Sequence, residues 1–508
     1  MGISITLKIH DTEKIGIGIN KIGIFLYQNF IFLHKIHHIW NDYVSKLKEE
    51  SMATYNSESG DINMVLTGES LITRGTSMFT EENYLKMVEI MRAGDVTFTN
   101  AEMIFHDYES PNNPHQLGTY MRSSPQNIKE LQWMGVNLVA CSNNHAYDFG
   151  EGGILKNIEN LDKFGLAHAG SGKNLADARE PGYIDTDAGR VALISLTDSG
   201  PAEGRAGEQR RDMQGRPGVS WLRSTAIYYV DQESLDSLKK ISQGLGFEDQ
   251  KKAREFTEDS STEFHLFGQP MYSPVPTLKF VLSKDGKFGQ TRIPNQYDME
   301  QILDRVSDAK RMADWVLVTM HNHQGGATIT DPGDHLVTFA KAALDAGADV
   351  YTGHGPHRDR GIEIYKGKPI FYSLGDFFMQ NDTVLRTPQD RYLMEGLGWD
   401  SVPADFYDTR SGTKYSEDHV NNDTKGMPAD FRQWESTMAQ VKFKGKKLSE
   451  ITLLPLDLGF RRSRGTRGRP TLATGEVAKS VLENMQQMSS KYGTKITIKG
   501  ETGSVDLS

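Results

Sequence analysis

The sequence predicts an α/β protein built around a largely buried sheet. Three observations support this fold class. Short apolar runs rich in β-branched residues recur along the chain, helical stretches separate several of them, and polar residues gather where the runs end. Strands that alternate with helices form a mainly parallel sheet whose faces are covered by the helices, which explains why such strands are apolar nearly throughout.

The expected strands and helices follow one another in a regular order. Seven apolar runs are expected to be strands, at 62–70, 95–102, 136–145, 190–200, 314–323, 348–357 and 369–378. Helices are expected between several of these runs, for example at 81–94 and 333–348. Near the C-terminus we expect strand-like sequence at 437–458, a helix at 475–493 and a short strand at 494–498.

Two polar stretches interrupt this order. Residues 201–300 are expected to form an excursion over the edge of the sheet, with an amphipathic helix near 230–245. A second insert is expected at about 386–430. The main domain is therefore predicted at 62–385, and residues 386–508 are predicted to be a C-terminal extension that completes the fold.

Composition bounds the class of protein. With 508 residues, of which 37% are hydrophobic and 24% charged, the chain can bury at least one large core. Its formal charge of −10 argues against a general nucleic-acid binder, whose binding domain is normally basic. No run approaches the roughly 20 apolar residues that span a bilayer. Cys141 is the single cysteine, so no intramolecular disulfide can form, and its place in an expected strand predicts a core residue.

The first 61 residues differ from the rest and are predicted to be an extension outside the fold. Residues up to 51 are rich in Ile, Lys, Phe and His, whereas Met52 opens a polar stretch of the kind that begins cytosolic proteins. Translation from Met52 would predict a cytoplasmic protein. An apolar run behind Lys21 leaves membrane association or export as the alternative, although no small-residue cleavage site follows it.

The expected strands end in side chains of the kinds that bind metal ions. Carboxylate, amide and imidazole groups stand there, at Glu69, Glu102, Asn143, Asn144, His145, Asp198, His321, His323, His354, His357 and Asp376. In open α/β sheets, ligands bind beyond the carboxyl ends of the strands. The sequence therefore predicts a metal site at that edge of the sheet.

Two pairs of histidines strengthen this prediction. His321 and His323 are two residues apart, so both imidazoles would point to one face of an extended strand and could chelate one ion or two adjacent ions. His354 and His357 belong to the turn "GHGPH" behind another expected strand. Oxygen and nitrogen ligands without thiolate favour Mn, Zn or Fe over a structural zinc site, which usually contains cysteine.

The next residues to consider follow the expected strand at 136–145. Asn144 can offer an amide oxygen to a metal ion, and His145 can donate a proton instead of binding the metal. The glycines of "AYDFGEGG" behind them allow a sharp entry into a helix. We therefore assign Asn144 and His145 as the candidate catalytic residues, with Asn144 also a candidate ligand.

Several motifs together resemble one known family. They are "GESLITR" (68–74), "NAE" (100–102), "NNHAYDFGEGG" (143–153), "HNH" (321–323), "DAGADVYTGHGPH" (345–357) and "GIEIYKGKPIFYSLGDF" (361–377). Their order and spacing resemble those of the CapA-type poly-γ-glutamate capsule synthesis proteins, PGA_cap, over about residues 62–385. That family is similar to the calcineurin-like metallophosphoesterases. The resemblance implies a four-layer α/β sandwich with long inserts and a two-metal centre.

The resemblance also implies roles for individual residues. Metal ligands would be Glu69, Glu102, Asn144, His321, His354 and His357, and His145 would be the general acid. Arg74 and Arg223 would bind an anionic group of the substrate. The sequence departs from the family pattern at three points: Glu69 replaces an aspartate, Asp376 replaces an asparagine, and "HNHQGG" makes His323 an extra candidate ligand.

These observations predict a metal-dependent hydrolase that acts on an anionic substrate. The resemblance implies a γ-glutamyl polymer or a related amide, attacked by hydroxide that two divalent transition-metal ions activate. The alternatives are a phosphoesterase and a non-catalytic accessory protein of poly-γ-glutamate capsule synthesis. The arginine-rich stretch 460–470 is either a solvated basic loop or a lip that attracts anions toward the site.

Overall fold

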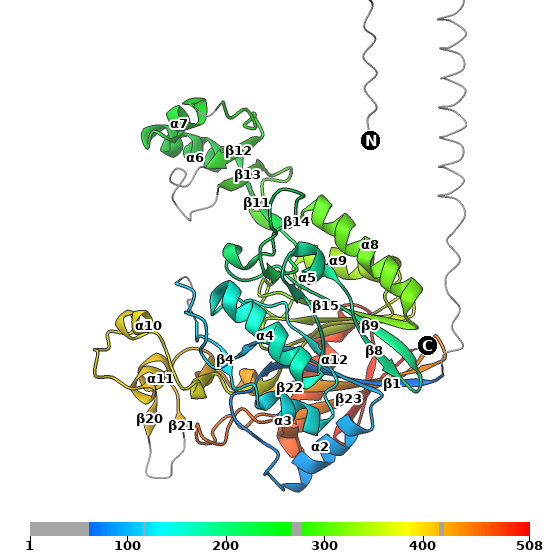
Figure 1. Cartoon of the computed structure of the whole chain (residues 1–508). Helices are drawn as coiled ribbons and strands as arrows, with labels where there is room; N and C mark the ends of the chain where they lie inside the picture. Colours follow the sequence, from blue (N-terminus) through cyan, green and yellow to red (C-terminus); the bar gives the residue numbers. More distant parts are fainter. Residues whose placement is uncertain (1–59, 115–117, 254, 267–276, 416–420, 508) are drawn as a thin grey trace, which may run out of the picture. The chain divides into compact units, whose positions relative to one another are not determined.

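The computed structural model describes residues 60–507, except for 115–117, 254, 267–276 and 416–420. The extension predicted for residues 1–61 lies outside the described part of the chain, apart from its last two residues. Two large sheets lie face to face, and helices cover their outer faces (Figure 1). This arrangement confirms the predicted four-layer α/β sandwich.

The larger sheet contains ten strands and is mixed. Its path runs β25 (Ile496–Lys499), β26 (Thr502–Val505), β23 (Lys447–Asp457), β22 (Glu435–Lys444), β1 (Ile62–Leu71), β2 (Val96–Ala101), β5 (Leu138–Ala140) and β6 (Ala167–Ala169). Two further strands join it from the side: β19 (Asp376–Met379) pairs with β1, and β24 (Thr471–Leu472) pairs with β23.

The smaller sheet contains six strands, in the order β17 (Asp359–Tyr365), β18 (Lys368–Leu374), β16 (Val350–His354), β15 (Trp315–His321), β9 (Gly189–Thr197) and β8 (Gly182–Thr186). The strands expected from the seven apolar runs are all present, as β1, β2, β5, β9, β15, β16 and the pair β18 and β19. The strand expected over 314–323 is shorter than predicted, because β15 ends at His321.

Side chains that alternate between the two faces of a strand explain why the larger sheet contributes to two hydrophobic cores. In β1, Met64 and Leu66 point into the space between the sheets, where they pack with Leu317 of β15. Val65 points the other way and packs under α2 (Glu82–Arg92), α3 (Asn127–Met134) and α4 (Gly150–Phe164). The central strands β1, β2 and β5 are therefore buried on both faces, as their near-continuous apolar sequence predicts.

Helical periodicity explains the outer layer of the smaller sheet. In α9 (Asp334–Asp345), Leu336, Phe339, Ala340 and Ala343 share one face, and all four are buried in the cluster that also holds residues of α8 (Gln296–Met312). The helix predicted at 333–348 is thereby confirmed. Cys141 is also buried, as expected for a core residue, and burial raises the pKa of its thiol to about 12.

The C-terminal part of the chain builds one half of the larger sheet. Strand β22 pairs antiparallel with β1, and Leu66 is aligned with Ala439. Helix α12 (Gly475–Ser490) packs against β17 of one sheet and β23 of the other. Its Leu482 and Met485 enter the core between the sheets. The helix therefore closes that side of the sandwich.

The first insert contains a sheet that the sequence did not reveal. Strands β12 (Glu263–Leu266), β13 (Leu278–Leu282), β11 (Ser224–Val230) and β14 (Gly289–Pro294) form it, with α6 (Gln232–Gly244) and α7 (Phe247–Ala253) beside it (Figure 1). The predicted helix near 230–245 is confirmed as α6. The apolar segments of these strands are short and stand in polar sequence, and most residues of β11, β13 and β14 are only half-buried or exposed, so the strands did not stand out.

The second insert carries two short helices, α10 (Gln389–Met394) and α11 (Pro403–Ser411), and the pair β20 (Lys414–Tyr415) and β21 (Asn421–Asn422).

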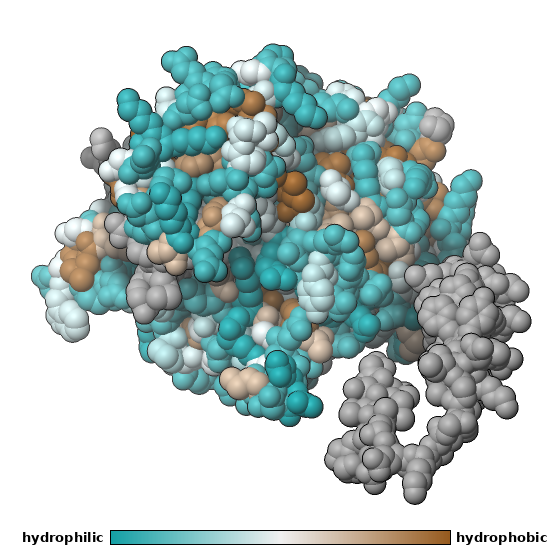
Figure 2. All heavy atoms as spheres, turned by 90° about the horizontal axis from the view of Figure 1, so that it is seen from above, coloured by the Kyte–Doolittle hydropathy of each residue, from teal (hydrophilic) through white to brown (hydrophobic). Residues whose placement is uncertain are grey.

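The face of the molecule in Figure 2 is mostly hydrophilic, and its apolar side chains form small separate groups. Among the described residues, no helix has both the length and the apolar character needed to cross a membrane.

A buried ion network ties the second insert to the arginine-rich stretch. The Arg467 side chain is fully buried, its Nε donates to Asp382 Oδ2 at 2.8 Å, and its Nη1 donates to Asp423.

We expect Arg467→Ala to lower the free energy of unfolding by about 3–5 kcal/mol, because both carboxylates stay buried without their partner. Urea denaturation measures this change. The exposed Arg461→Ala is the control, and equal stability of the two variants would contradict the expectation.

Candidate metal centre

The pairing of strands brings the predicted ligands together in two rows. In the larger sheet, Glu69 of β1 is aligned with Asn100 of β2 and with Asp376 of β19. In the smaller sheet, His321 of β15 is aligned with His354 of β16. Since these strands run parallel and the sheets are stacked, their carboxyl ends meet at one edge of the sandwich. The register of each sheet therefore sets the positions of the ligand side chains.

Glu102 lies at the centre of the cluster. Its Oε1 is 3.7 Å from His321 Nε2, 3.7 Å from His357 Nε2 and 3.9 Å from His145 Nε2. Glu69 approaches the same histidines, with its Oε2 3.3 Å from His357 Nδ1 and its Oε1 4.0 Å from His321 Nδ1. Both glutamates are fully buried. Carboxylates and imidazoles from both sheets thus face one small volume.

Two groups of side chains have the spacing of metal ligands. One consists of Glu69, Glu102, His357 and Asp376, and the other of Glu102, His323 and His357; within each group the ligand atoms lie within 4.8 Å of one another. The two groups share Glu102 and His357. Asp376 was noted in the sequence as a strand-end carboxylate but not as a ligand, and its place in the first group is new.

The cluster contains an unusual number of buried polar atoms that have no hydrogen-bond partner among the described residues. They are Glu69 Oε2, both Glu102 oxygens, Asn144 Oδ1, His321 Nε2, both His354 ring nitrogens and Asp376 Oδ2. Each such atom normally costs about 1–3 kcal/mol, so native proteins rarely tolerate a group of them. Divalent metal ions would satisfy these oxygen and nitrogen donors. The residues at the centre therefore fit a metal site.

The electrostatics of the cluster suit the same role. Burial lowers the pKa of His321 and lowers that of His354 to about 4, so both rings are neutral near pH 7 and keep a lone pair for a ligand bond. Burial and the charge of Glu69 raise the pKa of Glu102. Burial alone would lower the pKa of His357, but Glu69 and Asp376 outweigh it and raise that pKa to about 9. A bound cation would relieve the crowding of carboxylates.

The "GHGPH" turn fits closely against its neighbours. The backbone N–H of Gly355 donates to Glu69 Oε1, which fixes the carboxylate. Gly355 has a φ of 120°, and a side chain there would collide with the backbone of Asn322. His357 has a φ of 53°, a left-handed conformation that costs a non-glycine residue energy. The turn therefore holds its two histidines in place at the expense of local strain.

His145 stands at the margin of the centre with an oriented ring. Its Nδ1 is 2.7 Å from Asp148 Oδ2, which also accepts the backbone N–H of Met121 at 2.6 Å. Asn143 Oδ1 accepts the backbone N–H of His145 at 3.1 Å. The other ring nitrogen, Nε2, faces Glu102. Asp148 was missed in the sequence, although its spacing of three residues from His145 was a signal.

A cleft of about 310 Å³ opens onto the centre. Asn144, His145, His323 and His357 line it together with residues of other segments, among them Arg410. Arg410 belongs to α11 of the second insert, and nothing in that polar stretch of sequence pointed to it. Its Nη1 donates to Thr119 Oγ1, and it forms no ion pair with any residue that the structure describes. Burial lowers its pKa.

The two arginines predicted to bind substrate lie elsewhere. The Arg74 guanidinium donates to the backbone carbonyls of Gly465 and Arg467. Arg223 forms a pair with Asp298, with Nε 2.7 Å from Oδ2. Neither residue is among those that line the cleft. Their contacts show positions in the scaffold, and a role in substrate binding stays a prediction without support from geometry.

His323 differs from the prediction in its setting. Because β15 ends at His321, the two histidines do not share an extended strand, and His323 is exposed. Its ring centre is nevertheless 4.9 Å from that of His321 and 5.6 Å from that of His357. His323 therefore reaches the centre from the loop behind the strand.

The arginine-rich stretch is mostly engaged in ion pairs. Arg464 pairs with Asp408, Arg467 with Asp382 and Asp423, and Arg469 with Glu81. Arg461 and Arg462 are exposed. Most of the positive charge in this stretch is thus balanced within the protein, which weakens the interpretation as an anion-attracting lip.

Similarity to known proteins is extensive. A family model described as "Bacterial capsule synthesis protein PGA_cap" matches residues 57–381. A Sinorhizobium fredii protein, "Uncharacterized protein y4uA", is 34% identical over 451 residues, which cover 87% of this chain and 93% of that protein. The "PGA biosynthesis protein CapA" of Bacillus subtilis is 23% identical over 360 residues, 70% of this chain and 71% of its own. A "Probable polyglutamine synthesis accessory protein" of Mycobacterium tuberculosis is 27% identical over 259 residues, which cover 50% of this chain and 48% of that protein.

Proposed function

Because the chain belongs to the bacterial capsule synthesis protein PGA_cap family, we propose that it is a metal-dependent hydrolase that cleaves a γ-glutamyl polymer or a related anionic amide. The observation that carries this proposal is the convergence of buried carboxylate, amide and imidazole atoms without hydrogen-bond partners at one edge of the sandwich. The family relation supplies the substrate class, since the B. subtilis relative is named for PGA biosynthesis.

Side chains from both sheets would hold two divalent transition-metal ions, Mn, Zn or Fe. The proposed ligands are Glu69, Glu102, Asn144, His321, His323, His354 and His357, and Asp376 joins them from β19. Such ions supply Lewis acidity, which lowers the pKa of a water molecule and offsets the negative charge that develops on the substrate oxygen. The absence of cysteine from the cluster agrees with this choice of metals.

His145 is the proposed proton donor to the leaving nitrogen. Asp148 holds its Nδ1, so the ring presents Nε2 toward the centre and cannot rotate freely. A carboxylate in this position also stabilises the protonated ring, as general acid catalysis requires. His145 lines the cleft, where a bound substrate can reach it. The chain thus offers a donor next to the residues that would hold the metal.

Arg410 is the proposed anchor for a negative group of the substrate. Its guanidinium lines the cleft and forms no ion pair with the described residues, so its charge is available to a ligand. A guanidinium binds a carboxylate through two parallel hydrogen bonds. The second insert would therefore contribute to recognition of the substrate.

Replacing Arg410 tests this role. We expect Arg410→Ala to lower kcat/KM about 10- to 100-fold, mainly through KM, because a charge-assisted hydrogen bond contributes about 1.5–3 kcal/mol. Arg410→Lys should recover part of the loss. Arg461→Ala removes an exposed arginine of the arginine-rich stretch and should leave kcat/KM unchanged. If Arg461→Ala lowered kcat/KM more than Arg410→Ala did, the anion-binding site would lie in the arginine-rich stretch instead.

A screen of substrates tests the function itself. The full chain, loaded with Mn or Zn, is incubated with poly-γ-glutamate, short γ-glutamyl amides and phosphoesters, and released amine and phosphate are measured. We expect new amino groups to appear from the γ-glutamyl substrates. Release of phosphate alone would identify a phosphoesterase instead. Bound metal with no hydrolysis of any substrate would indicate a non-catalytic accessory protein.

A further inference from the structure

A second cavity lies apart from the metal centre, between the two sheets and α12. Its volume is about 220 Å³, and its walls come from the beginnings of β17 and β22, from α12 and from two neighbouring loops. None of the candidate metal ligands lines it. The cavity therefore needs an explanation of its own.

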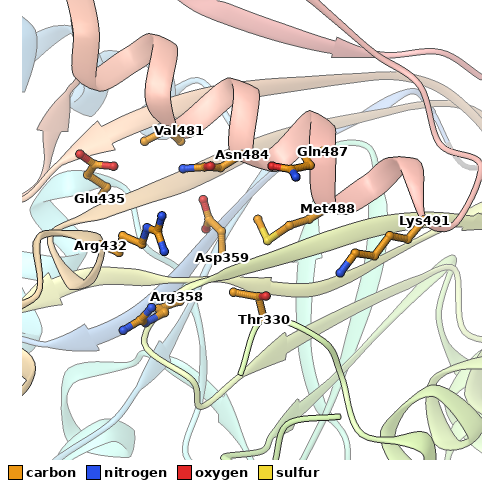
Figure 3. A pocket seen from close by; sticks show the side chains of 10 residues that line it. All are labelled: Thr330, Arg358, Asp359, Arg432, Glu435, Val481, Asn484, Gln487, Met488 and Lys491. Carbon is orange, nitrogen blue, oxygen red and sulfur yellow. The ribbon is translucent and has the colours of Figure 1, made fainter. Parts of the chain in front are cut away.

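The lining contains one aspartate and one arginine for which the described residues provide no ion-pair partner, Asp359 and Arg432. Arg432 and Asp359 both face the cavity, with Asp359 between Arg432 and Met488 (Figure 3). Arg432 forms no ion pair with any described residue, and its guanidinium lies over the Phe431 ring at 5.5 Å. Asp359 Oδ2 accepts from Thr437 Oγ1 at 2.6 Å, whereas the buried Oδ1 has no partner within the described part of the chain.

Three further charged residues line the cavity, and each has a partner elsewhere: Arg358 pairs with Asp430, Lys491 pairs with Asp331, and Glu435 accepts from Ser480 Oγ. The neutral part of the lining comes mainly from one face of α12. Asn484 and Gln487 turn their amides toward the cavity, and Val481 and Met488 supply apolar surface (Figure 3). These four residues lie on one side of the helix because they are spaced at three, six and seven positions from Val481. The cavity thus combines charged groups of both signs with the neutral face of α12.

We propose that this cavity is a binding site for a free α-amino acid. An α-amino acid carries its ammonium and its carboxylate on a single carbon atom, so its receptor needs an anionic and a cationic group side by side that are not paired with each other. The Asp359 carboxylate would accept from the ammonium, and Arg432 would donate to the carboxylate of the ligand. The side chain of the ligand would lie against Val481, Met488 and the two amides.

The site shares a wall with the metal centre. Arg358 lines the cavity and directly follows His357. Gln433 lines the metal cleft. With its amide in the orientation that satisfies both neighbours, its oxygen accepts from Arg358 Nε at 2.8 Å and its nitrogen donates to the His357 carbonyl at 2.8 Å. An amino acid in the cavity would therefore sit one residue away from a proposed ligand. The binding proposal itself does not depend on hydrolase activity.

Calorimetry on the metal-free full chain tests the proposal. The protein is treated with a chelator and titrated with each of the twenty common L-amino acids. We expect at least one to bind with saturation at one site per chain. The amine that lacks its carboxylate and the acid that lacks its ammonium should each bind at least tenfold more weakly, because each leaves one charged group of the cavity without a partner.

Variants locate the binding site. Arg432→Ala and Asp359→Asn should each weaken binding of that amino acid at least tenfold, and Arg210→Ala, which removes an exposed surface arginine, should not change it. Thermal unfolding confirms that the variants fold. No binding of any amino acid, or binding that both cavity variants retain, would overturn the proposal. Since no turnover is measured, neither result depends on whether the metal centre is catalytic.

Discussion

Replacing His321 by alanine is expected to remove the bound metal and to lower hydrolysis about a thousandfold. The His321 ring is buried, and its Nε2 has no hydrogen-bond partner among the described residues, so we expect its role in the fold to be small compared with its role as a ligand. Loss of Lewis acidity worth several kcal/mol corresponds to three or more powers of ten in rate. His354→Ala, in the aligned position of β16, should have the same effect.

Metal content and activity must be measured on the same preparations. Metal per chain is determined by inductively coupled plasma mass spectrometry after dialysis, and turnover is determined with the substrate found in the screen. His168→Ala is the matched control, because His168 lies in β6 and pairs with Asp162 away from the centre. If His321→Ala and His354→Ala both retain full metal content, the assignment of these ligands is wrong.

The second large effect is expected at His145. His145→Ala should retain the metal and lower kcat about 10²- to 10⁴-fold, which is the usual contribution of a positioned proton donor. Asp148→Asn should also lower kcat, because it weakens the contact that orients the ring. A loss of kcat without a loss of bound metal distinguishes a proton donor from a metal ligand.

Controls for His145 use the same two measurements. Asp162→Asn changes an exposed carboxylate that also contacts a histidine, and it should leave both metal content and kcat unchanged. Loss of metal in His145→Ala would make His145 a ligand. Unchanged kcat in His145→Ala, with metal bound, would show that another group supplies the proton.

Much of the centre could be predicted because strand ends obey a simple rule. The sequence shows which runs are strands and which polar residues follow them, and parallel strands bring those residues to one edge. Glu69, Glu102, His321, His354 and His357 were found in this way, and the structure brings all five into contact distance or register. Their predicted chemical roles await the experiments above.

Residues outside the strand ends could not be found by that rule. Arg410 lies in a polar insert, and only the folded position of α11 brings it to the cleft. The rule also gives no guidance for Arg74 and Arg223, whose local motifs give no sign of their distant partners; their predicted role in substrate binding stays a prediction. Arg223 pairs with Asp298, 75 residues further along the chain, and Arg74 donates to Gly465 after 391 residues. A long flexible side chain is directed by such contacts rather than by its neighbours in sequence.

The mixed origin of the ligands has a consequence for biosynthesis. Glu69 belongs to a strand near the beginning of the fold, whereas the Gly355 amide that fixes it lies 286 residues later. Such distant segments must meet before the site exists. A nascent chain therefore cannot bind metal at this centre until β16 and the turn behind it have left the ribosome and the two sheets have packed against each other. Metal uptake would therefore mark the completion of folding and would not guide its early steps.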